Sequence, residues 1–143
     1  MAASDFDHVV EQYHLGLDEF MMGNTEPMQK LYSHRDDVSL ANPFGPAVRG
    51  WKQVVETMER AASHYRDGEA KSFENIVTYV TPELAYIVEV ERARAKVGRR
   101  QEIASIALRV TTIFRPEDGA WKVLHRHADP ITSVRQTESV IQT

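Results

Sequence analysis

Apolar side chains near the start of the chain recur at steps of three and four residues. The residues with this spacing are Phe6, Val9, Val10, Tyr13, Leu17, Phe20 and Met21. Such spacing places them on one face of an α-helix. The pattern predicts a helix over residues 5–22, which ends at Gly23 and Asn24 because glycine favours helix C-termini.

Two more helical segments are expected before residue 70. Thr25 precedes a short apolar stretch and can cap a second helix, whose first turn tolerates Pro27. The segment Asn42-Pro43-Phe44-Gly45-Pro46 holds too many prolines for a helix, so a short strand followed by an ordered loop is predicted over residues 38–50. A third amphipathic helix is then expected from Trp51, with its end at Asp67-Gly68, where glycine can adopt the left-handed C-cap conformation.

The second half of the chain is rich in β-branched and aromatic residues. Four runs of this kind are predicted as strands, at about residues 70–81, 84–97, 102–115 and 120–129. Short turn-forming segments separate them, which favours an antiparallel meander. Helices followed by a meander predict an α+β domain with its helices on one face of the sheet. A core over about residues 5–130 and a polar C-terminal tail, 131–143, are expected within one domain spanning 1–143.

Composition narrows the classes of partner. The chain has 143 residues, of which 42% are apolar and 27% charged, and its formal net charge is −4. This length suits one domain, and the charge disfavours nucleic acids and anionic membranes as partners. The sequence contains no cysteine, so disulfides and thiolate metal sites are excluded. Without a signal peptide or a run of about 18 apolar residues, a cytoplasmic location is expected.

Two phrases in the sequence carry a family resemblance. One is Val38-Ser39-Leu40-Ala41-Asn42-Pro43-Phe44-Gly45 with Gly50-Trp51 after it, and the other is Asp118-Gly119-Ala120-Trp121-Lys122-Val123-Leu124-His125-Arg126-His127. Together with the order of elements, they make residues 5–130 resemble the SnoaL-like branch of the NTF2-like superfamily. The resemblance implies a cystatin-like cone, in which three N-terminal helices pack on a strongly curved antiparallel sheet around a pocket.

The ketosteroid isomerases of this superfamily offer a comparison residue by residue. Their catalytic tyrosine segment is similar to Val9-Val10-Glu11-Gln12-Tyr13, and their catalytic aspartate segment is similar to Asn42-Pro43-Phe44-Gly45. An asparagine amide has no proton to exchange near neutral pH, so Asn42 cannot be the general base of that reaction. The second acid of those enzymes falls near Val110. The resemblance therefore supports the scaffold and argues against ketosteroid isomerisation.

A second comparison is with the association domain of calmodulin-dependent protein kinases, which ends in a similar Asp-Gly-x-Trp and His-x-His. The three pocket arginines of that domain fall on Val88, Thr112 and Ala128 in this sequence. A role as a kinase hub is therefore not supported, while the scaffold again matches.

Strand alternation sorts the candidate pocket residues. Side chains two apart share a face of a strand, and Ile106, Leu108, Val110, Thr112 and Phe114 make one face apolar. We expect this face to point at the helices. The register of the resemblance turns two further sets of side chains the same way, namely Tyr86, Val88, Val90 and Arg92 on one strand and Leu124, Arg126 and Ala128 on another.

An arginine inside an apolar cone needs a partner, because an unpaired buried charge is costly. Arg92 or Arg126 would therefore hold a ligand oxygen, or would pair with Glu74, Glu89 or Glu91. Candidate catalytic groups are Tyr13, Asn42 and Arg126, which can polarise or orient a carbonyl group. Alternatively, Tyr13 is a core tyrosine and Asn42 forms an ordinary turn. Candidate ligand-binding residues are Leu17, Tyr32, His34, Phe44, Trp51, Val88, Arg92 and Val110.

His125, His127 and Asp129 lie at alternate positions of the last predicted strand, and such side chains can bind zinc. The register turns this face away from the cone, so a hydrogen-bonded homodimer interface on the outer sheet face is expected instead of a metal site. No cofactor is predicted.

Two functional hypotheses follow. One is a cofactor-independent isomerase, cyclase or hydrolase that acts on a small, largely apolar carbonyl compound. The other is a non-catalytic ligand-binding or homodimeric assembly module.

Overall fold

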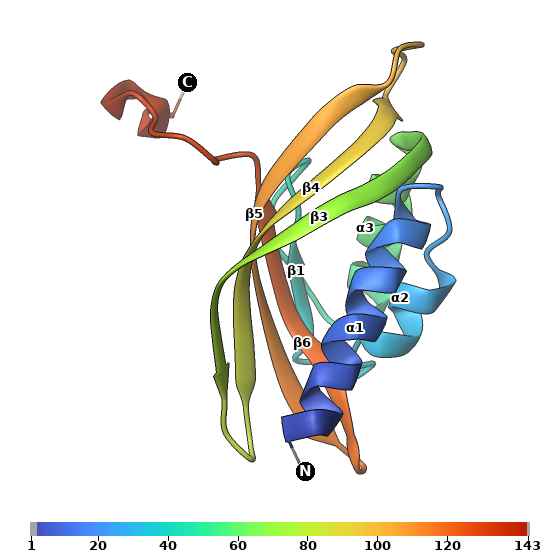
Figure 1. Ribbon diagram of the computed structural model, residues 1–143, viewed down its shortest axis with the longest axis vertical. Helices are drawn as coiled ribbons and strands as arrows, with labels where there is room; N and C mark the ends of the chain where they lie inside the picture. The colour runs from blue at the N-terminus through green and yellow to red at the C-terminus, as the bar shows by residue number, and fades with distance from the viewer. Residues whose placement is uncertain (1–2, 143) are drawn as a thin grey trace.

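The apolar stripe of the first helix fixes the helical layer against the sheet. The computed structural model describes residues 3–142, and α1 (Ala3–Phe20), α2 (Glu26–Leu31) and α3 (Trp51–Ala62) all lie on one side of the sheet (Figure 1). Buried side chains along α1 include Phe6, Tyr13 and Leu17. These helices close the concave side of the sheet, as the sequence predicts.

Six strands form one bent sheet in the order β2-β1-β6-β5-β4-β3. The strands are β1 (Ser39–Ala41), β2 (Val48–Arg49), β3 (Tyr65–Val80), β4 (Ala85–Val97), β5 (Ala104–Glu117) and β6 (Ala120–Asp129). Neighbouring strands are antiparallel except β1 and β6, which run parallel. The meander from β3 to β6 confirms the predicted α+β fold, and the strand bounds agree with the predicted runs except that β3 begins earlier.

The strand register corrects the predicted inner face of β4. Residues paired directly across antiparallel strands share a face, and Glu91 pairs with Leu108 while Glu89 pairs with Val110. The odd-numbered positions of β4 therefore face the helices, and both glutamates are buried. The prediction that Val88 and Arg92 point into the cone is wrong, because these side chains lie on the outer face.

The start of β3 corrects the predicted end of the third helix. α3 stops at Ala62, and β3 begins at Tyr65. Asp67 has a φ of 52° within a register shift of the β3–β4 pair. Gly68 is needed for close packing and caps no helix: a Cβ placed there would lie 2.7 Å from both Ala95 Cβ and the Met21 carbonyl oxygen.

The narrow end of the cone is packed with aromatic rings. The ring of Phe6 meets the rings of Phe114 and Trp121 edge-on, with centroids 5.1 and 5.3 Å apart. The Tyr13 ring also lies edge-on to Phe114, at 5.7 Å. Edge-on contacts of this kind add stability beyond their buried area. The free space inside the cone is therefore left at its other end, between the C-terminal part of α1, α2 and α3.

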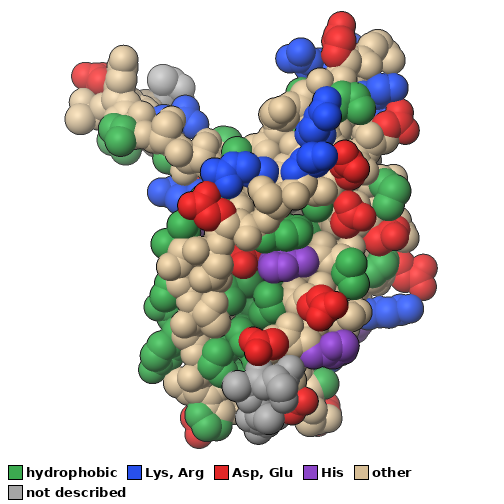
Figure 2. All heavy atoms as spheres, in the orientation of Figure 1, with side chains coloured by type: hydrophobic (Ala, Val, Ile, Leu, Met, Phe, Trp, Pro, Cys, Tyr) green, Lys and Arg blue, Asp and Glu red, His purple; other side chains and the backbone are tan. Residues whose placement is uncertain are grey.

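Two surface features complete the fold. In Figure 2 many basic side chains lie toward the end of the molecule where the β4–β5 turn lies; the end of β4 carries Arg94 and Lys96, and the turn carries Arg99 and Arg100. The C-terminal residues leave the body on the side of the sheet opposite the helices (Figure 1) and expose Val134 and Val140. Within residues 3–142, no helix is both long and apolar enough to cross a membrane.

Candidate functional site: a buried ion pair beside an apolar pocket

Four polar side chains from four elements meet inside the cone. Arg126 on β6 donates from Nη1 and Nη2 to the two carboxylate oxygens of Glu91 on β4, both at 2.8 Å. Arg126 Nη1 also donates to the hydroxyl of Tyr13 on α1. That hydroxyl lies 2.7 Å from Oγ1 of Thr112 on β5. The network ties the first helix to three neighbouring strands.

The network is largely buried and electrically balanced. The side chains of Arg126 and Glu91 are 12% and 9% exposed, so both charges have lost most of their water. A buried ion pair repays this desolvation only with good geometry and further hydrogen bonds. Tyr13 supplies one such bond. The positive charge of Arg126 and the negative charge of Glu91 cancel, so the pair as a whole is neutral.

Burial also acts on the tyrosines. Desolvation, opposed by the nearby Arg126 charge, raises the pKa of Tyr13 to about 12. Burial likewise raises the pKa of Tyr32 and of Tyr65 above the ordinary value. All three phenols therefore keep their protons at neutral pH, so each can donate a hydrogen bond.

We expect the Tyr13 phenol to make folding stability fall at alkaline pH. In the unfolded chain this phenol loses its proton near pH 10, whereas in the folded protein it holds the proton to about pH 12. The unfolded state thus binds fewer protons in this window, and the stability contributed by Tyr13, about 2–3 kcal/mol, is lost as the pH rises through it. Urea unfolding at a series of pH values should give Tyr13→Phe a shallower decline than the wild type. Identical declines above pH 10 would contradict this expectation.

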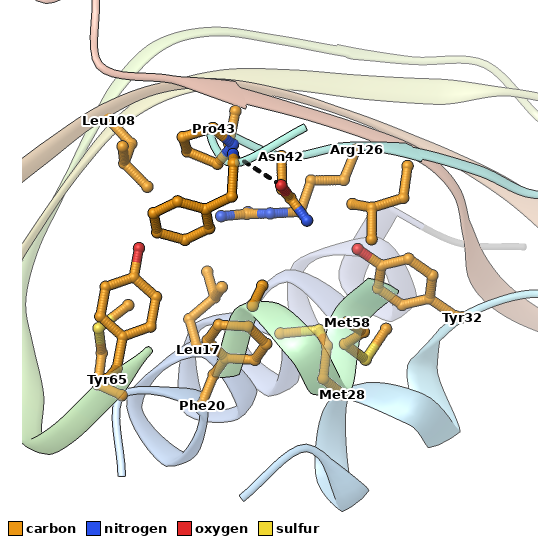
Figure 3. A pocket seen from close by; sticks show the side chains of 15 residues that line it. Leu17, Phe20, Met28, Tyr32, Asn42, Pro43, Met58, Tyr65, Leu108 and Arg126 are labelled. Atoms are coloured by element: carbon orange, nitrogen blue, oxygen red, sulfur yellow. Dashed lines mark hydrogen bonds between the residues drawn. The ribbon is translucent and has the colours of Figure 1, made fainter. Parts of the chain in front are cut away.

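An apolar pocket opens next to Arg126 (Figure 3). Its wall is mostly hydrocarbon, thioether and aromatic side chains from all three helices, the loop after β1 and the sheet. The residues that line it are Leu17, Phe20, Met21, Met28, Tyr32, Leu40, Asn42, Pro43, Phe44, Met58, Ala61, Tyr65, Leu108, Arg126 and Ala128. No aspartate, glutamate or histidine is among these described residues.

The pocket is narrow but adaptable. Its atom-free space, including the mouth, is about 490 Å³, and the centre of a water molecule can move through about 40 Å³ of it. That is enough for ordered water, which needs roughly 10–15 Å³. Met21, Met28 and Met58 are unbranched, flexible side chains that can re-pack around a larger occupant.

The polar groups at the pocket are hydrogen-bond donors without protein partners. An arginine has five N–H groups, and Arg126 uses those of Nη1 and one of Nη2 for Glu91 and Tyr13. Within residues 3–142, nothing accepts a hydrogen bond from its Nε–H. The hydroxyls of Tyr32 and Tyr65 and the amide nitrogen of Asn42 also have no partner in that part of the chain. In Figure 3 the two hydroxyls point into the pocket from opposite ends.

The structure brings together only some of the predicted site residues. Leu17, Tyr32, Asn42, Phe44 and Arg126 line the pocket. Tyr13 lies behind Arg126 and does not line it. The Asn42 side chain also shapes the loop, because its Oδ1 accepts a hydrogen bond from the Phe44 amide at 2.9 Å.

Other predicted residues lie elsewhere. The exposed His34 ring stacks on Trp51, with centroids 3.8 Å apart, and its Nε2 donates to the Gln29 carbonyl oxygen. Val110 is buried and packs with Leu108 and Ala128, which line the pocket, but it does not line the pocket itself.

Both candidate arginines follow the predicted alternative of ion pairing with a glutamate. Arg92 pairs with Glu74 at 2.9 Å on the outer face, and Val88 lies beside them on the same face of β4. Arg126 pairs with Glu91, another of the three partners expected for a buried arginine.

The sequence interpretation missed a second, partly buried pair, formed by His14 and Glu89. His14 Nε2 lies 2.7 Å from Glu89 Oε1, and the His14 ring stacks on Phe73 with centroids 3.8 Å apart. His14 follows Tyr13 directly in the sequence and lies beside the apolar stripe of α1, so the helical spacing does not single it out. A signal existed in the two glutamates at alternate positions of one strand, since a buried carboxylate needs a partner from another element.

The last strand directs its two histidines outward, as expected. His125 Nδ1 lies 2.7 Å from Ser39 Oγ, and burial lowers the pKa of this histidine. His127 Nε2 lies 3.0 Å from Oδ2 of Asp129. The two carboxylate oxygens of Asp129 each accept a hydrogen bond from Arg109. Residues 3–142 contain no group of three or more acidic or histidine side chains arranged to hold a metal ion.

Three helices over a bent sheet, with a pocket between them, define the NTF2-like class of α+β proteins. An NTF2-like superfamily protein from Salmonella enterica is similar, with a TM-score of 0.76 and 14% identity over 94% of each chain. A candidate dehydratase of the NTF2-like family from Streptomyces avermitilis has a TM-score of 0.70 and 17% identity, over 92% of this chain and 100% of that one. A ketosteroid isomerase-like protein from Erwinia carotovora has a TM-score of 0.70 and 13% identity, over 91% and 96%. At these identities the similarity concerns the fold.

The sequence assigns the chain more narrowly within this class. Residues 8–132 match the SnoaL-like domain family. The chain therefore belongs to the SnoaL-like domain family. A search of curated proteins gives no significant match.

Proposed function

We propose that this protein binds a small, largely apolar molecule through a neutral carbonyl oxygen, with Arg126 as the donor to that oxygen. The observation that carries the proposal is the unused Nε–H of Arg126 at an apolar pocket. A guanidinium offers a planar pair of donors there that an oxygen can accept. Trp121 Nε1 is the buried side-chain N–H without a partner among the described residues, so the Nε–H of Arg126 is open to the pocket, where a ligand oxygen can accept its hydrogen bond.

The charge balance favours a neutral oxygen over a carboxylate at this position. Glu91 already neutralises Arg126. A second carboxylate at the free edge would leave a net negative charge in a dry site, which is unfavourable. Asn42, Tyr32 and Tyr65 add neutral donors, so a ligand with more than one acceptor oxygen is also accommodated.

The pocket lining favours binding over the predicted isomerase, cyclase or hydrolase. Abstraction of a proton normally needs a carboxylate or an imidazole within hydrogen-bond reach of the substrate. The residues that line the pocket include neither. The donors can still polarise a carbonyl group, so chemistry that requires only this polarisation is compatible with the site.

A matched pair of probes tests the proposal. We expect 2-acetylnaphthalene to bind about tenfold more tightly than 2-ethylnaphthalene, since a hydrogen bond to a charged group contributes roughly 1.5–3 kcal/mol before desolvation of the ketone is counted. In Arg126→Lys, which keeps the charge beside Glu91 but lacks the planar edge, this preference should disappear. Equal affinities in the wild type, or an unchanged preference in Arg126→Lys, would contradict the proposal. Arg92→Lys on the outer face is the control.

We further propose that the outer sheet face forms a homodimer. Val88 and the ring pair Tyr79 and Tyr86 give this face apolar surface beside His125 and His127. Sedimentation equilibrium should give twice the chain mass, and Val88→Glu should lower it. A mass of one chain at micromolar concentration would contradict the proposal.

A further inference from the structure

A second hollow lies immediately outside the pocket. One side of it is the end of α3 with the turn that follows, which contribute Thr57, Arg60, Ala61 and His64, and the other side is the loop that runs from Asn42 to Val48 at the start of β2. Water molecules have about 240 Å³ available in this hollow, compared with about 40 Å³ in the pocket. Thr57, Arg60 and Ala61 follow a helical spacing of three and four, which turns them toward the same loop.

The polar groups in this hollow are again donors, but here one of them, the Arg60 guanidinium, carries a positive charge, and His64 adds an imidazole ring. Arg60 is exposed, and within residues 3–142 no acceptor pairs with its guanidinium. The His64 ring packs at 4.9 Å from the Phe44 ring, and no described residue hydrogen-bonds to its side chain. No aspartate or glutamate lines the hollow among the described residues. The hollow is therefore electrostatically suited to an anion.

The hollow and the pocket are joined at shared residues. Asn42, Phe44 and Ala61 line both. Phe44 is 47% exposed and is in contact with both spaces. An occupant of the pocket that extends past Phe44 would enter the hollow and meet Arg60 and His64.

We propose that this hollow is an anion subsite for the outer end of the ligand, which is then an amphipathic molecule ending in a carboxylate or a phosphate. The inference rests on the proposed function, since the apolar body of the ligand occupies the pocket. Different arginines bind the two ends of the ligand. The neutralised Arg126 takes a neutral oxygen inside, and the unpaired Arg60 takes the charge at the mouth, where water limits the desolvation cost.

Displacement of the neutral fluorophore N-phenyl-1-naphthylamine tests the subsite. The competitors are octanol, octanoate and octyl phosphate, which share a chain and differ in the head group. We expect octanoate, octyl phosphate or both to compete about fivefold better than octanol, as a half-exposed ion pair allows. Arg60→Gln should remove that advantage and leave octanol unchanged. Lys52→Gln, the same change on an exposed residue at the other end of α3, should alter nothing.

The outcomes separate the two proposals. If the anionic competitors are no better than octanol, or if their advantage survives in an Arg60→Gln/His64→Gln double variant, the subsite is wrong. If the wild type binds neither this fluorophore nor 2-acetylnaphthalene, the proposed function fails instead. The competitor with the larger advantage identifies the anion as carboxylate or phosphate.

Discussion

Replacement of Arg126 by methionine is expected to lower the free energy of unfolding by about 3–5 kcal/mol, because removal of one member of a buried ion pair leaves the other charge without compensation. Glu91 would stay buried beneath α1, with both carboxylate oxygens deprived of their donor. The Tyr13 hydroxyl would also lose its hydrogen bond from the guanidinium. Urea unfolding followed by circular dichroism measures the loss.

Two further variants make this result specific. Arg126→Met combined with Glu91→Leu removes both charges and should recover much of the stability, since apolar groups of similar volume often replace a buried ion pair at little cost. Arg92→Met breaks the exposed pair with Glu74 and should cost at most about 1 kcal/mol. A loss below about 1 kcal/mol in Arg126→Met itself would mean that water reaches Glu91 and that the network is not dry.

Gly68→Ala is expected to destabilise the protein by about 3 kcal/mol, the upper part of the range for an overpacked site. The added methyl group would lie 2.7 Å from Ala95 Cβ, 2.7 Å from the Met21 carbonyl oxygen and 2.9 Å from the Arg94 carbonyl oxygen. Two of these three atoms are backbone, so the end of α1 or the β3–β4 pair must move. Thermal and urea unfolding provide the measurement.

Gly45→Ala is the matched control for this change. A Cβ at Gly45 would meet no atom within 4 Å, and the backbone there does not have a positive φ. Its effect should stay within about 0.5 kcal/mol, as for surface substitutions away from special features. Similar losses in the two variants would show that lost chain flexibility, and not the close approach at Gly68, sets the cost.

The helices and strands of the fold could be predicted from the sequence, but the role of Gly68 could not. The stripe through Phe6, Tyr13 and Leu17 and the alternation along β5 were readable because apolar periodicity is local. Gly68 looked like a helix cap because its role depends on contacts with residues 21 and 95, which no local pattern contains. Turn chemistry alone cannot separate a capping glycine from one that allows two backbones to meet.

The candidate site was predictable in part for the same reason. Arg126 was expected to point inward, and three glutamates were named as its possible partners. On β4, however, Tyr86, Val88 and Val90 made the wrong face look apolar. The buried face carries Glu89 and Glu91, whose partners are 75 and 35 residues away in sequence. The hydrophobicity of neighbouring residues cannot predict that a carboxylate is buried when its charge partner lies on a distant helix or strand.

The long sequence separation between Arg126 and its partners also determines when the buried network can form during folding. Glu91 obtains its charge partner only from the last strand, and Tyr13 lies 113 residues before the arginine that it contacts. Contacts this distant are slow to form because the entropy of closing the intervening chain must be lost first. During synthesis on the ribosome, Glu91 must therefore stay in water until β6, which carries Arg126, has been made. The inside of the cone can lose its water only when synthesis of the domain is nearly finished.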